Sequence, residues 1–292
     1  MVRALSYFQK AKQEHFAIGA FNAASIETLK AIVGAAKNLQ APVMIEASQG
    51  EINFFGLKEM VATVRAMEED YQVPIMLNLD HAPDYESCKA ALDAGFDYLH
   101  LDGSRLPYEE NIEQTKKIVE EAHEKKVLVE GEIDNINIKG AASADLRDID
   151  IETVRGEEVY TDPERAADFV TRTEVDTFAV FVGNVHGLYS QPKNLNLALL
   201  ERISEILPGK YLSLHGGSGI PDQDIKGAIN LGVVKINVNS ELRVAFRDKL
   251  KEVLNRSEES EVAIYKFMPE AIEAVQRIVE EKIKLFGNAN KT

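Results

Sequence analysis

Eight short apolar runs recur along this chain, and each is followed by a stretch with helical periodicity. We expect strands at 16–21, 42–47, 74–80, 97–102, 127–132, 177–183, 210–215 and 233–238. Most of these runs are nearly continuous Val, Ile, Leu, Met or Phe, which is typical of strands buried on both faces. The stretches between them predict helices at 27–39, 57–69, 85–94, 109–125, 163–171, 197–207 and 222–231. This order predicts an α/β fold, a (β/α)8 TIM barrel.

An open, doubly wound sheet is the alternative fold. It usually carries a glycine-rich turn after its first strand, and FNAASIE lacks that turn. No linker or break in composition divides the chain, so we expect residues 1–292 to form a single barrel domain. The tail at 242–286 is charged and helical, which predicts extra C-terminal helices. Residues 134–161 show no convincing period, and such a long loop is more often functional or mobile than idle.

The composition limits the partners and the compartment. The formal charge at pH 7 is −15, from 33 Lys and Arg against 48 Asp and Glu. Nucleic acid and anionic membranes need a basic surface, so we expect neither as a partner, although a local site can still bind an anionic small molecule. One cysteine, Cys88, excludes an intramolecular disulfide and fits a reducing compartment. Frequent charges near the start argue against a signal peptide, and no apolar run approaches the ~20 residues of a membrane span, so we expect a cytoplasmic protein.

Polar residues cluster at the ends of the predicted strands, where a barrel places its reactive groups. Three histidines, His81, His186 and His215, each follow an apolar strand and precede a small residue. Three imidazoles at the mouth of a barrel would form an open zinc site with a free position for substrate. His100 lies inside a strand and is expected to be packed or hydrogen-bonded. The other polar residues at strand ends are Asn22, Glu46, Asp80, Asp102, Glu130, Glu132, Asn237 and Asn239.

A glycine-rich turn at 216–221 (GGSGIP) lies between the seventh predicted strand and the next helix. Its glycines permit close approach of the backbone, and the helix N-terminus offers free N–H groups to an anion. This position in a barrel commonly binds phosphate. The neighbouring run KINVNSELR adds amide and hydroxyl donors. Together they predict a phosphorylated substrate.

Several motifs occur in order along nearly the whole chain. They are LDH at 79–81, LDGS and PYEENI within 101–112, VEGE at 129–132, TDPERAADFV, GNVHG at 183–187, LHGGSGIP at 214–221 and KINVNSELRVAF at 235–246. In these motifs the chain resembles the class II, metal-dependent fructose-bisphosphate and tagatose-bisphosphate aldolases.

The resemblance implies a zinc-dependent cleavage of a ketose 1-phosphate to dihydroxyacetone phosphate and an aldehyde, in a homodimer or homotetramer. His81, His186 and His215 match the zinc ligands, and Asp80 matches the acid/base. Another divalent metal is an alternative to zinc, and a monovalent cation is a further candidate cofactor. Glu132 matches a catalytic carboxylate that also belongs to an alternative metal position. Asp102 matches a second carboxylate near the metal, and Asn237 matches a catalytic amide. Phosphate contacts are implied for Gly187, Gly216, Gly217, Ser218, Gly219, Asn239 and Ser240, and substrate contacts for Asn22, Ser48 and Arg105.

The chain departs from the family pattern at positions that bear on the substrate. Asn78 replaces the first histidine of His-X-Asp-His, and Asp134 replaces a glycine of the mobile loop. Ser190 stands where a phosphate-binding lysine is usual, and Asn239 stands where an aspartate is usual. Tyr265 is nearest in register to the arginine that binds the distal phosphate.

These departures leave the substrate open. Fructose 1,6-bisphosphate is the first candidate. The first alternative is another ketose phosphate, tagatose 1,6-bisphosphate or one with a differently charged distal end, which Arg105 and Lys266 are candidates to bind. The second alternative is a non-catalytic barrel that binds zinc or a sugar phosphate.

Overall fold

The computed structural model describes residues 3–134, 160–258 and 260–292. In this part of the chain, parallel strands close into a barrel in chain order, which confirms the predicted fold class. Its strands are β1 (Ile18–Asn22), β2 (Val43–Ser48), β3 (Ile75–Ala82), β4 (Tyr98–Asp102), β5 (Leu128–Glu132), β6 (Thr177–Val180), β7 (Tyr211–Leu214) and β8 (Val233–Val238).

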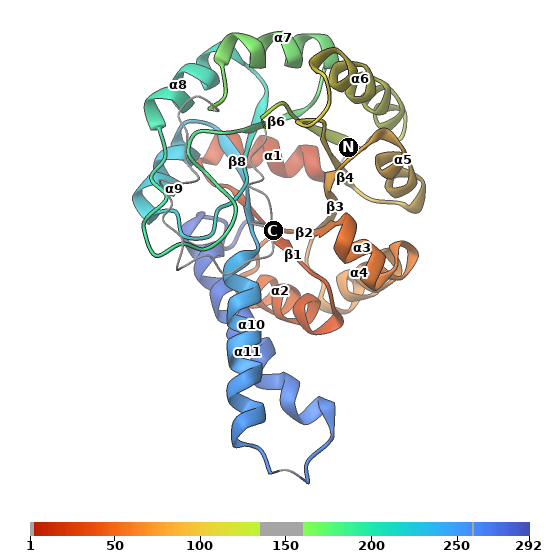
Figure 1. Ribbon diagram of the computed structural model, residues 1–292, viewed down its shortest axis with the longest axis vertical. Coiled ribbons are helices and arrows are strands. Elements are labelled where there is room, and N and C mark those ends of the chain that lie inside the picture. The colour runs from red at the N-terminus through yellow and green to blue at the C-terminus, as the bar shows by residue number, and fades with distance from the viewer. Residues whose placement is uncertain (1–2, 135–159, 259) are drawn as a thin grey trace.

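The described chain also contains helices, of which those between the strands form a ring around the barrel and the others precede or follow the strands (Figure 1). They are α1 (Arg3–Glu14), α2 (Ile26–Leu39), α3 (Gln49–Phe55), α4 (Leu57–Tyr71), α5 (Tyr85–Ala94), α6 (Tyr108–Glu124), α7 (Pro163–Thr173), α8 (Leu197–Ile206), α9 (Asp222–Asn230), α10 (Ser240–Arg256) and α11 (Ile264–Leu285).

Capping residues set several helix boundaries. Asp84 caps α5 by accepting the Ser87 N–H at 2.8 Å, and Gly95 ends that helix at φ +100°. Pro163 occupies the first turn of α7, where its missing N–H costs no hydrogen bond. Gly232 follows the end of α9 at φ +102° and leads into β8. Both glycines therefore stand at helix ends.

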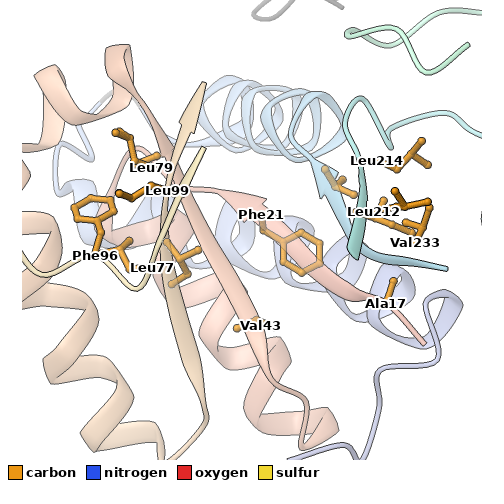
Figure 2. Packing of buried hydrophobic residues seen from close by; sticks show 14 of the residues in the cluster. Ala17, Phe21, Val43, Leu77, Leu79, Phe96, Leu99, Leu212, Leu214 and Val233 are labelled. Atoms are coloured by element: carbon orange, nitrogen blue, oxygen red, sulfur yellow. The ribbon is translucent and has the colours of Figure 1, made fainter. Parts of the chain in front are cut away.

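Side chains on the strands alternate between two apolar environments. Outward-facing residues pack against the ring of helices, and Figure 2 shows Phe21, Leu77 and Leu99 in this core. Inward-facing residues at the amino ends of the strands form a second cluster with α1, in which the rings of Phe8 and Tyr98 lie edge to face at 5.7 Å. Because α1 fills this end, the polar interior lies at the carboxyl ends of the strands.

The sixth strand is shorter than predicted, since β6 ends at Val180 and not at residue 183. The Phe181 N–H donates to Thr161 Oγ1 at 2.8 Å, and the Val182 N–H donates to Asn184 Oδ1 at 2.8 Å. Side chains thus replace the strand partners of these two N–H groups.

Two helices, α1 and α3, form where the sequence analysis assigned no structure. The extra C-terminal helices are present as α10 and α11, which lie side by side and project away from the barrel (Figure 1). No helix in the described part of the chain combines the length and the apolar character needed to cross a membrane.

Candidate active site

Side chains that face the barrel interior become polar toward the carboxyl ends of the strands. On most strands two polar residues lie two positions apart, so both point inward. These pairs are Glu46 and Ser48, Asn78 and Asp80, His100 and Asp102, Glu130 and Glu132, Ser213 and His215, and Lys235 and Asn237.

Four histidines meet at this end of the barrel. His81 Nε2 lies 3.0 Å from His215 Nδ1, and the ring centroids of His81 and His186 are 5.1 Å apart. His100 is fully buried, with its ring centroid 4.6 Å from that of His81. His81 has φ +49°, a left-handed conformation that costs energy in a residue with a side chain and is often found at functional sites. The structure therefore brings together the three histidines singled out in the sequence, and adds His100.

The donor atoms of this cluster fit a divalent metal. Two groups of ligand atoms lie within 4.8 Å of one another: Asp80, His81, His100 and His215, and His81, Asp102 and Glu132. Buried His186 Nε2 and Glu132 Oε1 make no hydrogen bond with any described residue, while Glu132 Oε2 lies 3.1 Å from His100 Nε2. Such atoms cost free energy unless they are paired, and imidazole nitrogens and carboxylate oxygens are zinc ligands. His186 lies outside both compact groups.

Charged neighbours control the protonation of His81. Its Nδ1 lies 2.9 Å from Asp102 Oδ2 and 3.4 Å from Glu132 Oε2. Burial opposes the charged imidazolium, but Asp80, Asp102 and Glu132 outweigh it and raise the pKa of His81 well above its usual value. Burial, together with the positive charges nearby, lowers the pKa of His186 well below its usual value.

Glu130 fixes the orientation of His215 from deeper in the barrel. Its Oε1 accepts from His215 Nε2 and Ser213 Oγ, both at 2.6 Å, and its Oε2 accepts from Lys235 Nζ at 2.9 Å and Tyr98 OH at 2.8 Å. All five side chains are fully buried. Burial opposes the charge of Glu130, but Lys235 and the histidines lower its pKa well below the usual range. The ionised carboxylate holds the proton on His215 Nε2, so Nδ1 faces the cluster with a lone pair.

Asp80 is held beside the cluster by two amides. Asn22 Nδ2 donates to its Oδ2 at 3.0 Å, and Asn237 Nδ2 donates to its Oδ1 at 3.2 Å. Burial opposes its charge, but His81 and His100 help to lower the pKa of Asp80 well below its usual value. The carboxylate is therefore ionised near neutrality and can accept a proton from a bound hydroxyl.

A cavity of about 350 Å³ opens above these groups, a volume suited to a small ligand. Glu132 and His215 lie behind its wall, and Gly217 and Gly219 are likewise not part of the lining. The other residues to which the resemblance assigned a catalytic, metal, phosphate or substrate role line it: Asn22, Ser48, Asp80, His81, Asp102, Arg105, His186, Gly187, Gly216, Ser218, Asn237, Asn239 and Ser240.

The glycine-rich turn after β7 presents fewer free N–H groups than the sequence suggested. The Gly217 N–H donates to Asn237 O at 2.8 Å, and the Gly219 N–H donates to Glu241 Oε1 at 2.7 Å. The N-terminus of α10, the positive end of its dipole, lies at the same wall of the cavity. The polar side chains here are those of Ser218, Asn239 and Ser240.

Two arginines line the cavity on opposite sides of the barrel, since Arg105 follows β4 and Arg243 follows β8. Arg243 was not among the residues predicted for the site. Its Nη2 pairs with Glu51 Oε1 at 2.7 Å, and Glu51 Oε2 accepts from Asn22 Nδ2 at 3.0 Å and from the Ser48 N–H at 2.8 Å. A chain of hydrogen bonds thus leads from Arg243 through Glu51 to the amide that holds Asp80.

Three positions discussed for substrate charge do not line this cavity. Tyr265 is 75% exposed at the start of α11, and the neighbouring Lys266 pairs with Glu261. Ser190 is exposed. Within one chain, Lys266 is therefore not placed to bind the distal end of the substrate, contrary to the expectation. Of the long loop, residues 135–159 lie outside the described residues, while Asp134 accepts from Thr161 Oγ1 at its base.

The family model for class II fructose-bisphosphate aldolases matches residues 2–291. The chain belongs to this family. Its relatives include the fructose-bisphosphate aldolase of Staphylococcus aureus, which is 36% identical over 287 residues, 96% of this chain and 95% of that protein. The sulfofructosephosphate aldolase of Alkalicoccus urumqiensis is 37% identical over 284 residues, 97% of this chain and 95% of that protein.

Solved structures agree with this assignment to the class II aldolases. The crystal structure of the YdjI aldolase from Escherichia coli K12 matches with a TM-score of 0.82 at 31% identity, over 100% of this chain and 98% of that chain. Membership of this lyase family confirms the prediction of an enzyme over that of a non-catalytic barrel. Since relatives of equal similarity carry the names of different aldolases, the family alone does not specify the substrate.

Proposed function

We propose that this protein is a zinc-dependent aldolase that reversibly cleaves a ketose 1-phosphate to dihydroxyacetone phosphate and an aldehyde. The observation that carries the proposal is the position of Asp80, an ionised carboxylate on the wall of the cavity, beside a cluster of histidines. A proton acceptor next to a metal-binding cluster is suited to breaking the bond between the alpha and beta carbons of a beta-hydroxy ketone.

The metal would be held by His81, His186 and His215, with Glu132 and Asp102 as carboxylates of an alternative position. Zinc bound there would act as a Lewis acid on the ketone of the substrate. Buried His186 Nε2, which makes no hydrogen bond with any described residue, supports this proposal, because a metal would supply its missing partner. Another divalent metal would use the same ligands.

Asp80 would move the proton of the reaction. In the cleavage direction its carboxylate takes the proton of the hydroxyl that becomes the aldehyde, and in synthesis it returns that proton. Asn22 and Asn237 hold both carboxylate oxygens, so the acceptor does not need to reorient. The Asn237 amide, 3.1 Å from His215 Nδ1, would also contact the reacting part of the substrate.

The phosphate next to the ketone would bind between the turns after β6 and β7 and the N-terminus of α10. This site offers the helix dipole and hydroxyl donors, while the N–H groups of Gly217 and Gly219 are already engaged. The phosphate-binding residues would be Gly187, Gly216, Ser218, Asn239 and Ser240.

The distal end of the substrate would also carry an anion. Arg243 and Arg105 are the arginines on the cavity wall, and Arg243 is fixed by Glu51 next to Ser48. Guanidinium groups bind phosphate and sulfonate oxygens through paired N–H donors. Fructose 1,6-bisphosphate is therefore our first candidate, with tagatose 1,6-bisphosphate and sulfofructose 1-phosphate as alternatives; the last is favoured by the sulfofructosephosphate aldolase among the relatives.

A substrate panel with metal analysis on one preparation tests this function. We expect release of dihydroxyacetone phosphate from one of the three doubly anionic substrates at a kcat/KM at least tenfold above that for fructose 1-phosphate, in protein that contains zinc. Absence of cleavage of every substrate by the metal-loaded protein would refute the proposal.

We also propose that the protein is a homo-oligomer that associates through α10 and α11. These helices project from the barrel (Figure 1), and large apolar side chains are exposed where α10 ends, where α11 begins and in the segment between them: Leu254, Val262, Ile264 and Tyr265. An exposed apolar cluster of this kind is typical of interaction sites. Light scattering should show a dimer or tetramer, and Ile264→Asp should shift it toward the monomer.

A further inference from the structure

A lysine ammonium lies buried beneath the two turns that form the phosphate end of the cavity. Lys193, between β6 and α8, has no exposed surface. Its Nζ donates to the carbonyl oxygens of Val185 at 2.9 Å, Gly187 at 3.1 Å and Gly216 at 2.6 Å. The first two residues belong to the turn after β6, and the third belongs to the turn after β7. One cation therefore joins both turns.

The two turns cross closely at this point. Gly216 adopts φ +61°, and a Cβ at this position would lie 2.6 Å from Val185 O, so a larger residue would push the turns apart. The backbone N–H of Lys193 donates to Gly219 O at 3.4 Å, which ties the lysine to the β7 turn at a second point. The ammonium is thus held at a fixed place relative to both turns.

The charge of Lys193 lies next to the polar wall of the cavity. Gly187 and Gly216, whose carbonyls it binds, both line that cavity. Its charge also adds to the effects of burial, His81 and His215 that lower the pKa of His186. A buried cation at this depth is screened little by solvent, so an anion in the cavity would be attracted to it.

Converging backbone carbonyl oxygens are the ligands with which proteins bind K⁺, since they replace its hydration shell. Here the same set of oxygens surrounds an ammonium that belongs to the chain. We propose that Lys193 occupies a monovalent-cation site and supplies, as a covalently attached cation, the positive charge for the phosphate beside the ketone. This deepens the proposed function, on which it rests for the identity of the anion.

Two consequences follow from this assignment. Lys193 would compensate for the family's phosphate-binding lysine, which is replaced by the exposed Ser190. The protein would also need no monovalent salt, because K⁺ and NH₄⁺ cannot enter an occupied site. Removing the ammonium should leave a site that either ion can fill.

The first test uses no substrate. Thermal unfolding midpoints of wild-type protein, Lys193→Met and Lys193→Gln are measured in tetramethylammonium, K⁺ and NH₄⁺ chlorides at equal ionic strength. We expect equal midpoints for the wild type in all three salts. Lys193→Met should unfold about 5 °C lower in tetramethylammonium and regain at least half of this loss in K⁺ or NH₄⁺.

Lys210→Met is the matched control, since Lys210 Nζ donates to a single carbonyl, Val175 O at 2.8 Å. It should show no preference among the salts. Lys193→Gln keeps one hydrogen-bond donor group, the side-chain amide, and replaces Lys193→Met in the measurement if the methionine variant does not fold. Selective stabilisation of the wild type by K⁺, or equal midpoints of a folded Lys193 variant in all three salts, would overturn the proposal.

The second test measures turnover of the zinc-loaded enzyme on the substrate selected by the panel. Lys193→Met should raise KM about tenfold in tetramethylammonium with a smaller change in kcat, and K⁺ or NH₄⁺ should restore KM. A merely structural role of Lys193 would give no recovery with these ions. If no substrate is cleaved, the proposed function fails. The salt dependence of the midpoints still shows whether Lys193 occupies a monovalent-cation site.

Discussion

Replacing Glu130 with glutamine removes a buried negative charge while it keeps the shape of the side chain. Lys235 Nζ lies 2.9 Å from both Glu130 Oε2 and Glu46 Oε1, and all three side chains are fully buried. The substitution leaves the lysine with one carboxylate in place of two. Breaking a buried ion pair by removing one partner costs about 3 kcal/mol or more. For a chain of this size that corresponds to a midpoint roughly 5 °C lower.

The same change should weaken zinc binding. The neutral amide oxygen of glutamine accepts from His215 Nε2 and Ser213 Oγ more weakly than the carboxylate does, so the interaction that keeps His215 Nδ1 unprotonated is weakened. Loss of such a partner typically costs 10- to 100-fold in metal affinity. Calorimetry of the metal-free protein and a competitive zinc titration measure the two effects separately.

The matched control is Glu273→Gln, which breaks an exposed pair with Arg277. It should leave both the midpoint and the zinc affinity unchanged. If Glu130→Gln unfolded at the wild-type midpoint and bound zinc as tightly as the wild type, the buried charge network would not hold the metal site as described.

Three further predictions concern the cavity and the core. Asp80→Asn should retain zinc and lose at least 100-fold in kcat, measured with a coupled assay for dihydroxyacetone phosphate; a wild-type rate would exclude Asp80 as the acid/base. Arg243→Gln should raise KM for the doubly anionic substrate about tenfold more than KM for fructose 1-phosphate, and Arg247→Gln on the same helix should change neither. Equal effects on both substrates would exclude recognition of the distal anion by Arg243. Burial raises the pKa of the Cys88 thiol, so iodoacetamide should label it only after unfolding; rapid labelling of the native protein would contradict its burial.

Much of the fold could be predicted from the sequence, because parallel strands buried on both faces form continuous apolar runs that alternate with amphipathic helices. The boundaries depended on side chains that the periodicity does not report. β6 ends at Val180 because Thr161 and Asn184 take the next N–H groups. Helix α1 was missed because it does not connect two strands, and it is held by packing beneath the barrel.

The residues of the candidate site could be predicted where they stand at strand ends, since the carboxyl ends of all strands meet at one rim. Lys235 and Glu130 were harder to assign, because a single polar residue within an apolar strand does not reveal which way it faces. Their spacing of two from Asn237 and Glu132 could have placed them on the inner face.

The Arg243–Glu51 pair could not be predicted from sequence patterns. The two residues are 192 positions apart and meet only because β8 closes the barrel against β1. Lys193 was missed for a related reason. Its partners are backbone carbonyls, which every residue has, so the amino-acid sequence does not indicate them.

Titration of zinc into chelator-treated protein, with cleavage of the preferred ketose phosphate followed at each addition, tests metal-dependent aldol cleavage most directly. We expect no turnover without metal, a linear rise of kcat with bound zinc, and saturation at one equivalent per chain. Full activity in metal-free protein, with zinc content verified by elemental analysis, would contradict metal-dependent cleavage at this site.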